Sequence, residues 1–359
     1  MRILIAVTGI GFGHTLRDYA LINEIFKKYP KTEIRIIGYG ISSRLFKNKF
    51  PLTEIKGPKL PDYEFNYKIR NIMISNLFYP IHYLFNKAKI SNIIKKFQPD
   101  ILISDFEPSA ISKDKKSFAI FNFNPNTLKD YGKEKGSNHS VRIQAGYVKH
   151  YYEKSNKVVI PTIFGPNRNS GKFFYTNPIV RMQPNELESE KKLMKKLKLK
   201  KKPILITIGG SNFGIGLVKK LLGIIPKFGE DFIIFGYPEE KTGKNIKIFR
   251  FKENFLEYLK VCKGIITLAG HNTLSEIIVY KKPSLIFPVR NHIEQILNAY
   301  EIEKKRYGIV KNLESLDGNL EFYINDFIEK IPSVQKRLNK LKVRGTGAEE
   351  IVKMIDRFK

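Results

Sequence analysis

The stretch GIITLAGHNTLSEIIVY, residues 264–280, decides the fold that we expect for this chain. Its first part, GIITLA, is a continuous apolar run of the kind that a buried parallel strand requires. Its last part, LSEIIVY, has the periodicity of a helix, and Gly270, His271 and Asn272 stand between the two. A buried strand that passes directly into a helix is the repeating unit of a parallel α/β sheet.

The same alternation of apolar strands and helical patterns occurs in both halves of the chain. In the first half we expect strands at residues 2–8, 33–39, 100–104, 118–123 and 157–162, and helices near 15–28, 68–97 and 139–154. In the second half we expect strands at 203–210, 231–236, 245–251, 264–269 and 283–288, and helices near 213–225, 254–262, 272–281 and 292–306. Because the pattern occurs twice, the sequence predicts two doubly wound, Rossmann-like α/β domains with parallel sheets.

The boundary between the domains is expected in a segment rich in proline, glycine and lysine. Residues 163–203 contain IFGPNRNSGKFFYTNPIVRMQP followed by LESEKKLMKKLKLKKKP, which is typical of a surface connection. We predict an N-terminal domain over residues 1–165, a linker over 166–202, a C-terminal domain over 203–330, and helices over 331–359 that pack back toward the N-terminal domain. Ligands of such sheets bind beyond the carboxyl ends of the strands, so we expect both domains to face one cleft with these ends.

Length and composition narrow the class of protein and its compartment. A chain of 359 residues with 42% hydrophobic residues suits two globular domains. The single cysteine, Cys262, cannot form an intramolecular disulfide, and we expect it to be buried. No window holds the roughly 18 apolar residues of a spanning helix, and the N-terminal run is too short for a secretion signal. These features predict a cytoplasmic protein, with a membrane surface still open to it.

The chain is strongly basic, with 64 Lys+Arg against 34 Asp+Glu and a formal charge of +30. Such a charge attracts phosphorylated substrates, anionic lipid or nucleic acid, and the alternative is a lysine bias of the lineage. No helix-turn-helix, zinc-finger or RNP pattern is present, so nucleic acid is the weakest of these partners. Residues 67–97 are apolar, aromatic and basic, as in an interfacial segment, although two ordinary helices separated at Pro80 would give the same pattern.

Glycines and a histidine follow the first predicted strand. Residues 8–18, TGIGFGHTLRD, place Gly11 and Gly13 just before His14 at the start of a helix. Glycines let backbone amides approach a ligand closely, although a tight turn alone would also explain them. The spacing is not GxGxxG and no acid follows the second strand, which disfavours NAD. A histidine in this position suits proton abstraction from a hydroxyl group.

Carboxylates and amides follow two further strands of the first half. We expect Asp105, at the end of DILIS, to orient His14, with Glu107 as the competing partner. A helix cap or a surface acid is the alternative role for Asp105. Asn122 and Asn124, at the end of FAIFNF, suit the hydroxyl groups of an acceptor, and turn formation would explain them equally well.

The opening stretch favours a nucleotide. The free amides of Gly270, His271, Asn272 and Thr273, together with the helix dipole, form a site for a diphosphate. Glu276 lies about one turn inside the helix, where a carboxylate can accept two hydrogen bonds from the vicinal diol of a ribose. The alternative is a capping box of Thr273 and Glu276, which would leave the preceding glycine and histidine unexplained.

Two weaker signals lie at neighbouring strand ends. Gly209, Gly210 and Ser211 form a compact turn whose amides and hydroxyl could bind phosphate. Glu294 and Gln295 begin the helix after the next strand and could bind the hydroxyls of a sugar. Ordinary polarity at the start of a helix would account for this pair as well.

Together these residues resemble the nucleotide-sugar glycosyltransferases of the GT-B fold, and in particular the family 28, MurG-like enzymes. The matching motifs occur in order over most of the chain as GFGH (11–14), TNPIVR (176–181), GGS (209–211), AGHNTLSE (269–276) and EQILNA (294–299). The chain also resembles an archaeal-type subgroup of glycosyltransferase-like proteins that carry SDFEP after a strand, here at residues 104–108.

The resemblance implies a role for each matching residue. Arg181 and Ser211 would contact the diphosphate, and Phe251 would flank the uracil. Gln295 would face the donor sugar, and Gly13 with His14 would line the reaction centre. The full donor set is then Gly11, Gly13, Arg181, Ser211, Phe251, Gly270, His271, Asn272, Thr273, Glu276, Glu294 and Gln295.

Two departures from the family pattern bear on the substrates. Glu294 replaces the first glutamine of the family's Q-Q pair, which leaves the identity of the sugar open. The acceptor loop H-E-x-N appears here as NFNP (122–125), without its acid, so the acceptor need not be the cell-wall lipid. Asp105 is the residue that would supply the missing carboxylate.

We therefore expect an inverting transfer of a hexose or N-acetylhexosamine from a UDP-sugar to a hydroxyl acceptor, either lipid-linked or of the cell envelope. His14 would deprotonate the acceptor and Asp105 would orient His14. The helix that begins at Gly270 would stabilise the departing diphosphate, so that no metal and no cofactor are required. A lipid acceptor would place the protein at the inner face of the cell membrane, where the surplus of lysine suits an anionic leaflet.

Two alternatives remain at this point. The first is a UDP-sugar 2-epimerase on the same fold, for which Glu294 and Glu107 would supply acids at the sugar carbon. The second is a nucleic-acid- or lipid-binding protein without enzymatic activity, built on a degenerate GT-B scaffold.

Overall fold

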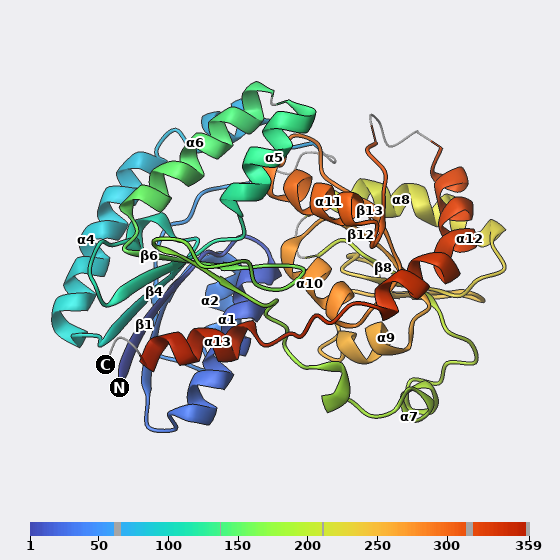
Figure 1. The fold of residues 1–359 in the computed structure, drawn as a ribbon, viewed down its shortest axis with the longest axis horizontal. Helices are drawn as coiled ribbons and strands as arrows, with labels where there is room; N and C mark the ends of the chain where they lie inside the picture. Colours follow the sequence, from blue (N-terminus) through green and yellow to red (C-terminus); the bar gives the residue numbers. More distant parts are fainter. Residues whose placement is uncertain (61–65, 137, 210–211, 314–318, 357–359) are drawn as a thin grey trace. The chain divides into compact units, whose positions relative to one another are not determined.

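The computed structural model describes residues 1–60, 66–136, 138–209, 212–313 and 319–356. The chain divides into two compact units, each with its own seven-stranded sheet (Figure 1). The first unit comprises Met1–Pro61, Lys68–Arg181 and Gly345–Lys359. The second comprises Asp62–Tyr67 and Met182–Arg344.

The sheet of the first unit is parallel throughout. Its strands are β1 (Arg2–Val7), β2 (Glu33–Gly38), β3 (Leu52–Glu54), β4 (Ile101–Asp105), β5 (Ser117–Ile120), β6 (Lys157–Pro161) and β7 (Phe173–Thr176). They lie in the order β3-β2-β1-β4-β5-β6-β7, so the direction of winding reverses between β1 and β4. Val7 at the end of β1 pairs with Asp105 at the end of β4. Ligands of doubly wound sheets bind at this switch point, beyond the carboxyl ends of the strands.

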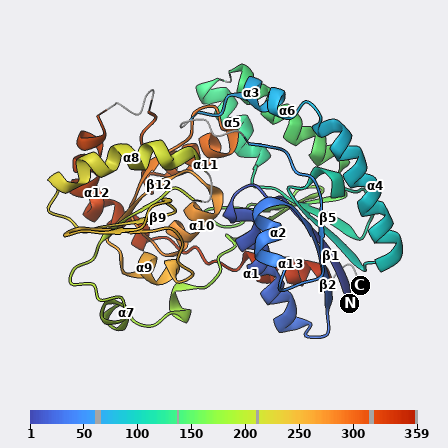
Figure 2. The ribbon, with the colours of Figure 1, turned by 180° about the vertical axis from the view of Figure 1, so that it is seen from behind.

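The helices of the first unit cover both faces of its sheet. They are α1 (Phe12–Lys28), α2 (Gly40–Phe46), α3 (Ile69–Ser75), α4 (Tyr79–Phe97), α5 (Pro125–Lys135), α6 (His139–Lys154) and α13 (Gly347–Ile355), with a short 3-10 turn, η1 (Pro108–Ala110). Pro80 lies in the first turn of α4, and the break that it predicts within residues 67–97 is confirmed between α3 and α4. Figure 2 shows α1, α2 and α13 on the side of the sheet away from α4.

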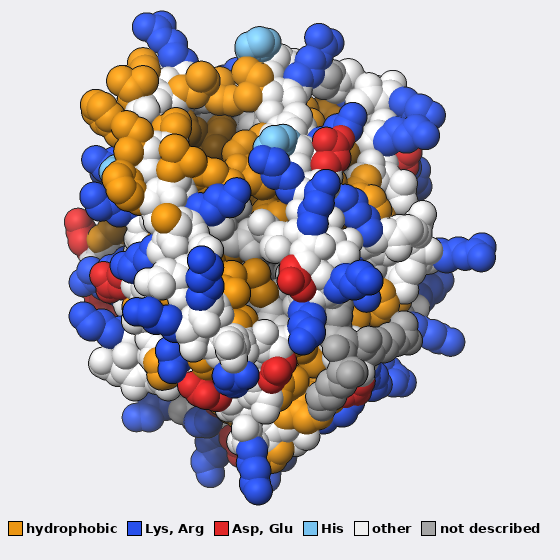
Figure 3. Space-filling view, turned by 90° about the vertical axis from the view of Figure 1, so that its left-hand side faces the viewer, with side chains coloured by type: hydrophobic (Ala, Val, Ile, Leu, Met, Phe, Trp, Pro, Cys, Tyr) orange, Lys and Arg blue, Asp and Glu red, His pale blue; other side chains and the backbone are white. Residues whose placement is uncertain are grey.

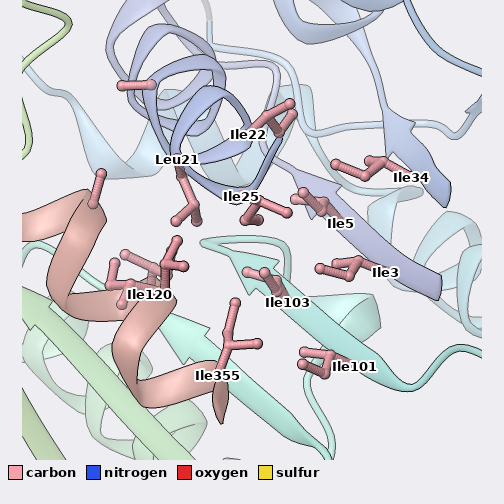
Figure 4. Packing of buried hydrophobic residues seen from close by; sticks show 14 of the residues in the cluster. Ile3, Ile5, Leu21, Ile22, Ile25, Ile34, Ile101, Ile103, Ile120 and Ile355 are labelled. Carbon is pink, nitrogen blue, oxygen red and sulfur yellow. The ribbon is translucent and has the colours of Figure 1, made fainter. Parts of the chain in front are cut away.

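Alternate side chains of the strands enter two separate cores, as the pleat of a strand requires. Ile3 and Ile5 of β1 belong to a buried cluster with α1 and α13. Leu4 and Ala6 belong to a second cluster with α4. Figure 4 shows the first cluster, in which Ile355 of α13 lies among the isoleucines of α1, β1 and β4.

The second unit repeats this architecture with one antiparallel edge. Its strands are β8 (Ile204–Thr207), β9 (Phe232–Phe235), β10 (Lys241–Thr242), β11 (Ile246–Phe249), β12 (Gly264–Leu268), β13 (Ser284–Phe287) and β14 (Ile309–Val310). They lie in the order β10-β11-β9-β8-β12-β13-β14, and among these described strands β10 alone pairs antiparallel. The switch point lies between β8 and β12. The prediction of two doubly wound parallel-sheet domains, the GT-B fold class, is confirmed.

The helices of the second unit alternate with its strands. They are α7 (Glu190–Lys196), α8 (Ile215–Ile224), α9 (Phe255–Val261), α10 (His271–Val279), α11 (Ile293–Lys305) and α12 (Leu320–Asn339), with the 3-10 turns η2 (Pro184–Glu186), η3 (Asn212–Gly214) and η4 (Ile225–Lys227). A Cβ atom at Gly264 would lie 2.8 Å from the ring of Phe327, so this glycine lets α12 pack closely on β12.

Two segments differ from the boundaries that the sequence suggests. The expected linker over 166–202 contains β7, which adds an aromatic edge strand, FFYT, to the first sheet. Of the C-terminal helices expected over 331–359, α13 packs on α1, whereas α12 belongs to the second unit because its apolar side covers β12 and β13. Proline and charge mark the surface of a chain, but they do not show which sheet the flanking residues join.

Two expectations from composition can also be compared with the structure. Cys262 is buried at the end of α9, and burial raises the pKa of its thiol to about 11. Among the described helices, none combines the length and the apolar character needed to cross a bilayer.

Candidate active site

The loop between β1 and α1 requires glycine at two positions. A Cβ atom at Gly9 would lie 1.8 Å from the carbonyl oxygen of Tyr39. Gly11 has a φ of 72°, in the left-handed region, and is the N-cap residue of α1. Gly13 then lies in the first turn, and His14 and Arg17 share one face of the helix because they are three residues apart.

His14, Asp105 and Arg17 meet at the switch point of the first sheet. The Nδ1 atom of His14 lies 2.8 Å from Oδ1 of Asp105, and Nε of Arg17 donates to Oδ2 at 2.9 Å. The side chains of Asp105 and Arg17 are fully buried, and that of His14 is 13% exposed. The structure therefore joins His14 to the carboxylate that ends β4, and leaves part of the imidazole accessible.

The charges of this cluster hold Asp105 in its ionised form. Burial by itself would raise the pKa of Asp105, but Arg17 and then His14 outweigh it and lower the pKa to about 2. Arg17 also donates to the side-chain oxygen of Asn122, which places Asn122 in the same network. An ionised, oriented carboxylate beside an imidazole is the arrangement that favours a histidine acting as a base.

A second carboxyl group, that of Asp18, interacts with Asp105. Asp18, on α1, is fully buried, and burial together with the neighbouring Asp105 charge raises its pKa well above the usual range, although Arg17 acts in the opposite direction. The pKa values of the two acids are thus shifted in opposite directions. This separation is the expected result when two carboxyl groups share one site.

Two residues expected near the acceptor have other contacts in the structure. The Oε1 atom of Glu107, the competing partner of His14, accepts from the backbone N–H and the hydroxyl of Ser109. The side-chain oxygen of Asn124 accepts from the N–H of Asn126 at 3.0 Å and caps α5. The capping role explains an asparagine at this strand end without any ligand.

In the second unit, α10 begins where the opening sequence motif places it. Gly270 is its N-cap residue and, as a glycine, makes no side-chain cap hydrogen bond. The helix starts at His271, so Thr273 lies inside it and the alternative of a capping box led by Thr273 is excluded. His271 is 4% exposed and Glu276 is 8% exposed, on the helix that leaves β12 at the switch point. The N–H groups of the first turn of a helix, together with the helix dipole, form a general kind of anion site.

Two amide side chains of α11 hold the turn before α10. Oε1 of Gln295 accepts from the N–H of Ala269 at 3.2 Å and from that of Val289 at 3.1 Å. Nδ2 of Asn298 donates to the carbonyl of Ala269 at 3.0 Å. Both side chains are buried. Gln295 therefore joins the ends of β12 and β13, which is a positioning role beyond the contact with a sugar expected from the sequence.

The remaining predicted donor residues are distributed around the second sheet and the boundary of the first unit. Phe251 follows β11 with 46% of its surface exposed, and Glu294 is half-buried in the first turn of α11. Arg181 is half-buried, and Asn272 is half-buried in the first turn of α10. Gly210 and Ser211 of the GGS turn lie outside the described residues. Within the described ranges, no group of three or more His, Cys, Asp or Glu side chains is placed to hold a metal ion.

Arg17, Asp18 and Asn298 are site residues that sequence reasoning did not select. Arg17 and Asp18 lie in the quoted stretch TGIGFGHTLRD, and the signal available was their spacing of three and four residues from His14 on one helix. Asn298 lies in EQILNA, three residues after Gln295, and the same helical spacing applies to it.

Comparison with known proteins agrees with this geometry. The family model described as glycosyl transferase family 1 matches residues 1–332. An uncharacterized glycosyltransferase of Methanosarcina acetivorans is 26% identical, with 99% of this chain and 98% of that protein covered. A UDP-N-acetylglucosamine–N-acetylmuramyl-(pentapeptide) pyrophosphoryl-undecaprenol N-acetylglucosamine transferase of Thermosipho melanesiensis is 27% identical, with 98% of each chain covered. The crystal structure of Acinetobacter baumannii MurG covers 99% of each chain with a TM-score of 0.62 at 12% identity, which concerns the fold alone.

The chain belongs to glycosyl transferase family 1 and is a glycosyltransferase of the GT-B fold. The resemblance to MurG-like enzymes that the motifs indicate is confirmed. These findings give no support to the epimerase or to the non-enzymatic alternative.

Proposed function

We propose that the donor of this glycosyltransferase is a UDP-sugar carrying a hexose or N-acetylhexosamine. The observation that carries the proposal is the start of α10 at the glycine N-cap Gly270, directly after β12, with Glu276 about one turn inside the helix. The turn before this helix is held on both its N–H and its carbonyl by Gln295 and Asn298, so the amides are fixed before a ligand arrives. The Thermosipho relative, by its name, uses a UDP-linked sugar.

The proposed reaction is a single displacement with inversion. The acceptor oxygen attacks the anomeric carbon and its proton passes to Nε2 of His14, while the bond to the diphosphate breaks and its electron pair leaves with the diphosphate. Because Nδ1 of His14 faces Asp105, the lone pair on Nε2 is the one available to the acceptor. The ionised Asp105 stabilises the imidazolium that forms, and Arg17 keeps that carboxylate in place.

We further propose that neither a metal ion nor a cofactor takes part. The developing charge on the diphosphate would be met by the amides and dipole of α10, a helix of nine residues. Transfer should then continue in the presence of excess EDTA, and loss of activity that added Mg²⁺ or Mn²⁺ restores would contradict this part of the proposal.

The acceptor side of the proposal concerns a membrane surface. Large hydrophobic side chains on α3, α4 and the loop between them are exposed, and they are Met73, Ile74, Leu77, Phe78, Ile81, Leu84 and Phe85. Figure 3 shows hydrophobic side chains gathered on this face, with Lys and Arg around them. Exposed apolar area of this extent marks an interaction site, and a charge of +30 favours an anionic leaflet. We infer a lipid-linked hydroxyl acceptor, with the protein peripheral to the inner face of the cell membrane.

The donor proposal is tested by titrating the full chain with UDP and with a panel of other nucleotides, using the melting temperature and calorimetry. UDP should bind, and Glu276→Ala should weaken its binding by about tenfold, the loss of one charged hydrogen-bond acceptor. Glu303→Ala, at an exposed position on α11, is the matched control and should bind UDP as the parent chain does. Equal UDP affinity in both variants would exclude Glu276 from the donor site.

A further inference from the structure

The carboxylates of Asp105 and Glu107, at the end of β4 and two residues apart, lie in different surroundings. Phe106 has a φ of 50°, in the left-handed region that a non-glycine residue rarely adopts. Asp105 before it contacts α1 through His14 and Arg17, whereas Glu107 after it accepts hydrogen bonds from Ser109. The ring of Phe106 stacks on that of His14, the proposed base, with 5.7 Å between the ring centroids. Glu107 is therefore the residue directly after one that contacts the base.

Glu107 is buried, and one of its two carboxylate oxygens has no hydrogen-bond partner among the described residues. Its exposed fraction is 0%. Oε1 accepts from Ser109, while Oε2 has no hydrogen-bond partner among the described residues. A buried oxygen without a partner is costly, and natural proteins retain such groups where a ligand or other function requires them.

Helix α4 packs against the 3-10 turn η1, which begins directly after Glu107, and five tyrosines of α4, α6 and the N-cap of α2 are influenced by this carboxylate. They are Tyr39, Tyr79, Tyr83, Tyr147 and Tyr151, which we call the tyrosine cluster. Burial is the main cause that raises the pKa of each of these hydroxyls, and the Glu107 carboxylate adds to the shift in all five. Within the cluster, the rings of Tyr147 and Tyr151 lie 4.8 Å apart.

The hydroxyls of the tyrosine cluster differ in what they bind. Tyr39 is hydrogen-bonded to Thr8 at 2.7 Å, and Tyr151 is hydrogen-bonded to both Tyr83 and Tyr147. The hydroxyl of Tyr79 is buried and has no partner among the described residues. The site thus holds an unused acceptor on Glu107 and an unused phenol on Tyr79, next to aromatic rings.

The chemistry of this site favours neutral hydroxyl groups. Burial raises the pKa of Glu107, and the interactions that oppose this shift are hydrogen bonds from Ser109 rather than a neighbouring cation. A phosphate would require Lys or Arg at this point. Phenols and a carboxyl group both donate to and accept from a sugar or polyol, and aromatic rings pack on its C–H faces.

We propose that the tyrosine cluster and Glu107 bind the hydroxylated head, a sugar or a polyol, of an amphiphilic acceptor whose apolar part lies on the exposed side chains of α3 and α4. This proposal rests on the proposed function, since it names the acceptor class for the same active site. Ile143 and Tyr147 of α6 are also exposed and extend the apolar surface to the tyrosine cluster. Figure 3 shows the hydrophobic side chains of this face gathered around a hollow.

The test measures binding of four probes with the same octyl chain to the full-length protein by calorimetry, below their micelle concentrations. Octyl glucoside and 1-O-octylglycerol represent a sugar and a polyol head, and octyl phosphate and octyltrimethylammonium represent charged heads. Tyr79→Phe removes only the unused hydroxyl, and Glu107→Gln replaces the carboxyl group, including the unpaired Oε2, by an amide of the same shape. Tyr19→Phe, on α1 against the opposite core, is the matched control.

One or both hydroxylated probes should bind the parent chain more tightly than the charged probes, and their relative affinity distinguishes sugar from polyol. Tyr79→Phe and Glu107→Gln should each weaken that binding by about fivefold, the loss of one hydrogen bond, and Tyr19→Phe should not. The proposal is overturned if neither substitution weakens binding, or if a charged probe binds as tightly and depends on the same residues. Thermal unfolding shows whether each variant folds. If Glu107→Gln does not fold, the binding data for Tyr79→Phe decide the outcome.

A parallel titration with UDP separates this inference from the donor proposal. Tyr79→Phe should leave the UDP affinity unchanged, because Tyr79 lies in the first unit and α10 in the second. If UDP fails to bind while the hydroxylated probes still depend on Tyr79, the donor proposal is lost and the head-group site stands. If UDP binds as proposed and binding of the probes does not depend on Tyr79, the donor proposal stands and the head-group site is lost.

Discussion

Nδ1 of His14 lies 2.8 Å from Oδ1 of Asp105, although the two residues are 91 positions apart in the chain. The pairing of β1 with β4 causes this contact, because Val7 and Asp105 are partners in the sheet and His14 follows β1 by one short loop. The imidazole is therefore oriented by the topology of the sheet, and the adjoining helix supplies Arg17 to hold the carboxylate.

The first prediction concerns the base. His14→Ala should lower the rate of sugar transfer by about 10²–10⁴-fold, the usual contribution of a general base, while UDP affinity stays unchanged. His139→Ala, at an exposed position on α6, is the control for a lost imidazole. Initial rates with a UDP-sugar and a lipid-linked acceptor measure the effect, and normal turnover by the His14 variant would remove it from the mechanism.

The second prediction compares two arginines paired with carboxylates. Arg17 is buried against Asp105, whereas Arg35 pairs with Glu33 at the surface at 3.3 Å. Arg17→Ala leaves the buried Asp105 charge with only the partly exposed His14 beside it and should lower the free energy of unfolding by about 3–5 kcal/mol. Arg35→Ala should lower it by less than about 1 kcal/mol. Urea unfolding measures both, and similar losses would show that Asp105 is not buried as an ionised group.

The third prediction concerns pH and Asp18. Burial and the Asp105 charge raise the pKa of Asp18 in the folded state, so the folded protein keeps a proton that the unfolded chain loses above about pH 4. This group therefore makes the protein less stable as the pH rises, by at most about 1.4 kcal/mol per pH unit. Asparagine cannot titrate, so the stability of Asp18→Asn in urea unfolding should fall less steeply as the pH rises above about 4. Parallel curves for parent and variant would show that Asp18 has an ordinary pKa.

The fourth prediction concerns the turn before α10. Gln295→Met keeps the volume of the side chain but loses the oxygen that accepts from Ala269 and Val289. The amides of the first turn should then be less well fixed, and UDP should bind about tenfold more weakly. Gln335→Met on α12 provides the control in the same unit. Unchanged UDP affinity in calorimetry would restrict Gln295 to a role in stability.

The fifth prediction concerns the exposed hydrophobic side chains of α4. Phe85→Ser should weaken binding to vesicles containing anionic lipid by about tenfold or more, since burial of a phenylalanine contributes about 1.5–3 kcal/mol. Phe322→Ser on α12 is the matched control, because Phe322 is exposed to a similar extent, 63% against 70%. Co-sedimentation measures binding, and an equal effect of the two substitutions would mean that the α3–α4 face has no special role.

The sequence allowed the prediction of the strands, of α10 and of the contact between His14 and Asp105, because all of these follow from where apolar strands end. Arg17 and Asp18 were not selected, because which face of α1 meets the sheet depends on the start of the helix at Phe12. The contacts of Gln295 depend on β12 and β13 lying side by side, which no local pattern shows. The left-handed backbone of Phe106 was also beyond prediction, since phenylalanine does not favour it.

The packing of α13 on α1 has a consequence for the order in which the molecule can be assembled. The cluster that contains Ile3 and Ile5 of the first strand also contains Ile351 and Ile355. A ribosome must therefore synthesise the whole second unit before the first can close its interior. During translation, the part of α1 that packs on α13 stays uncovered until α13 emerges, and a nascent chain halted before residue 345 would present that part to chaperones.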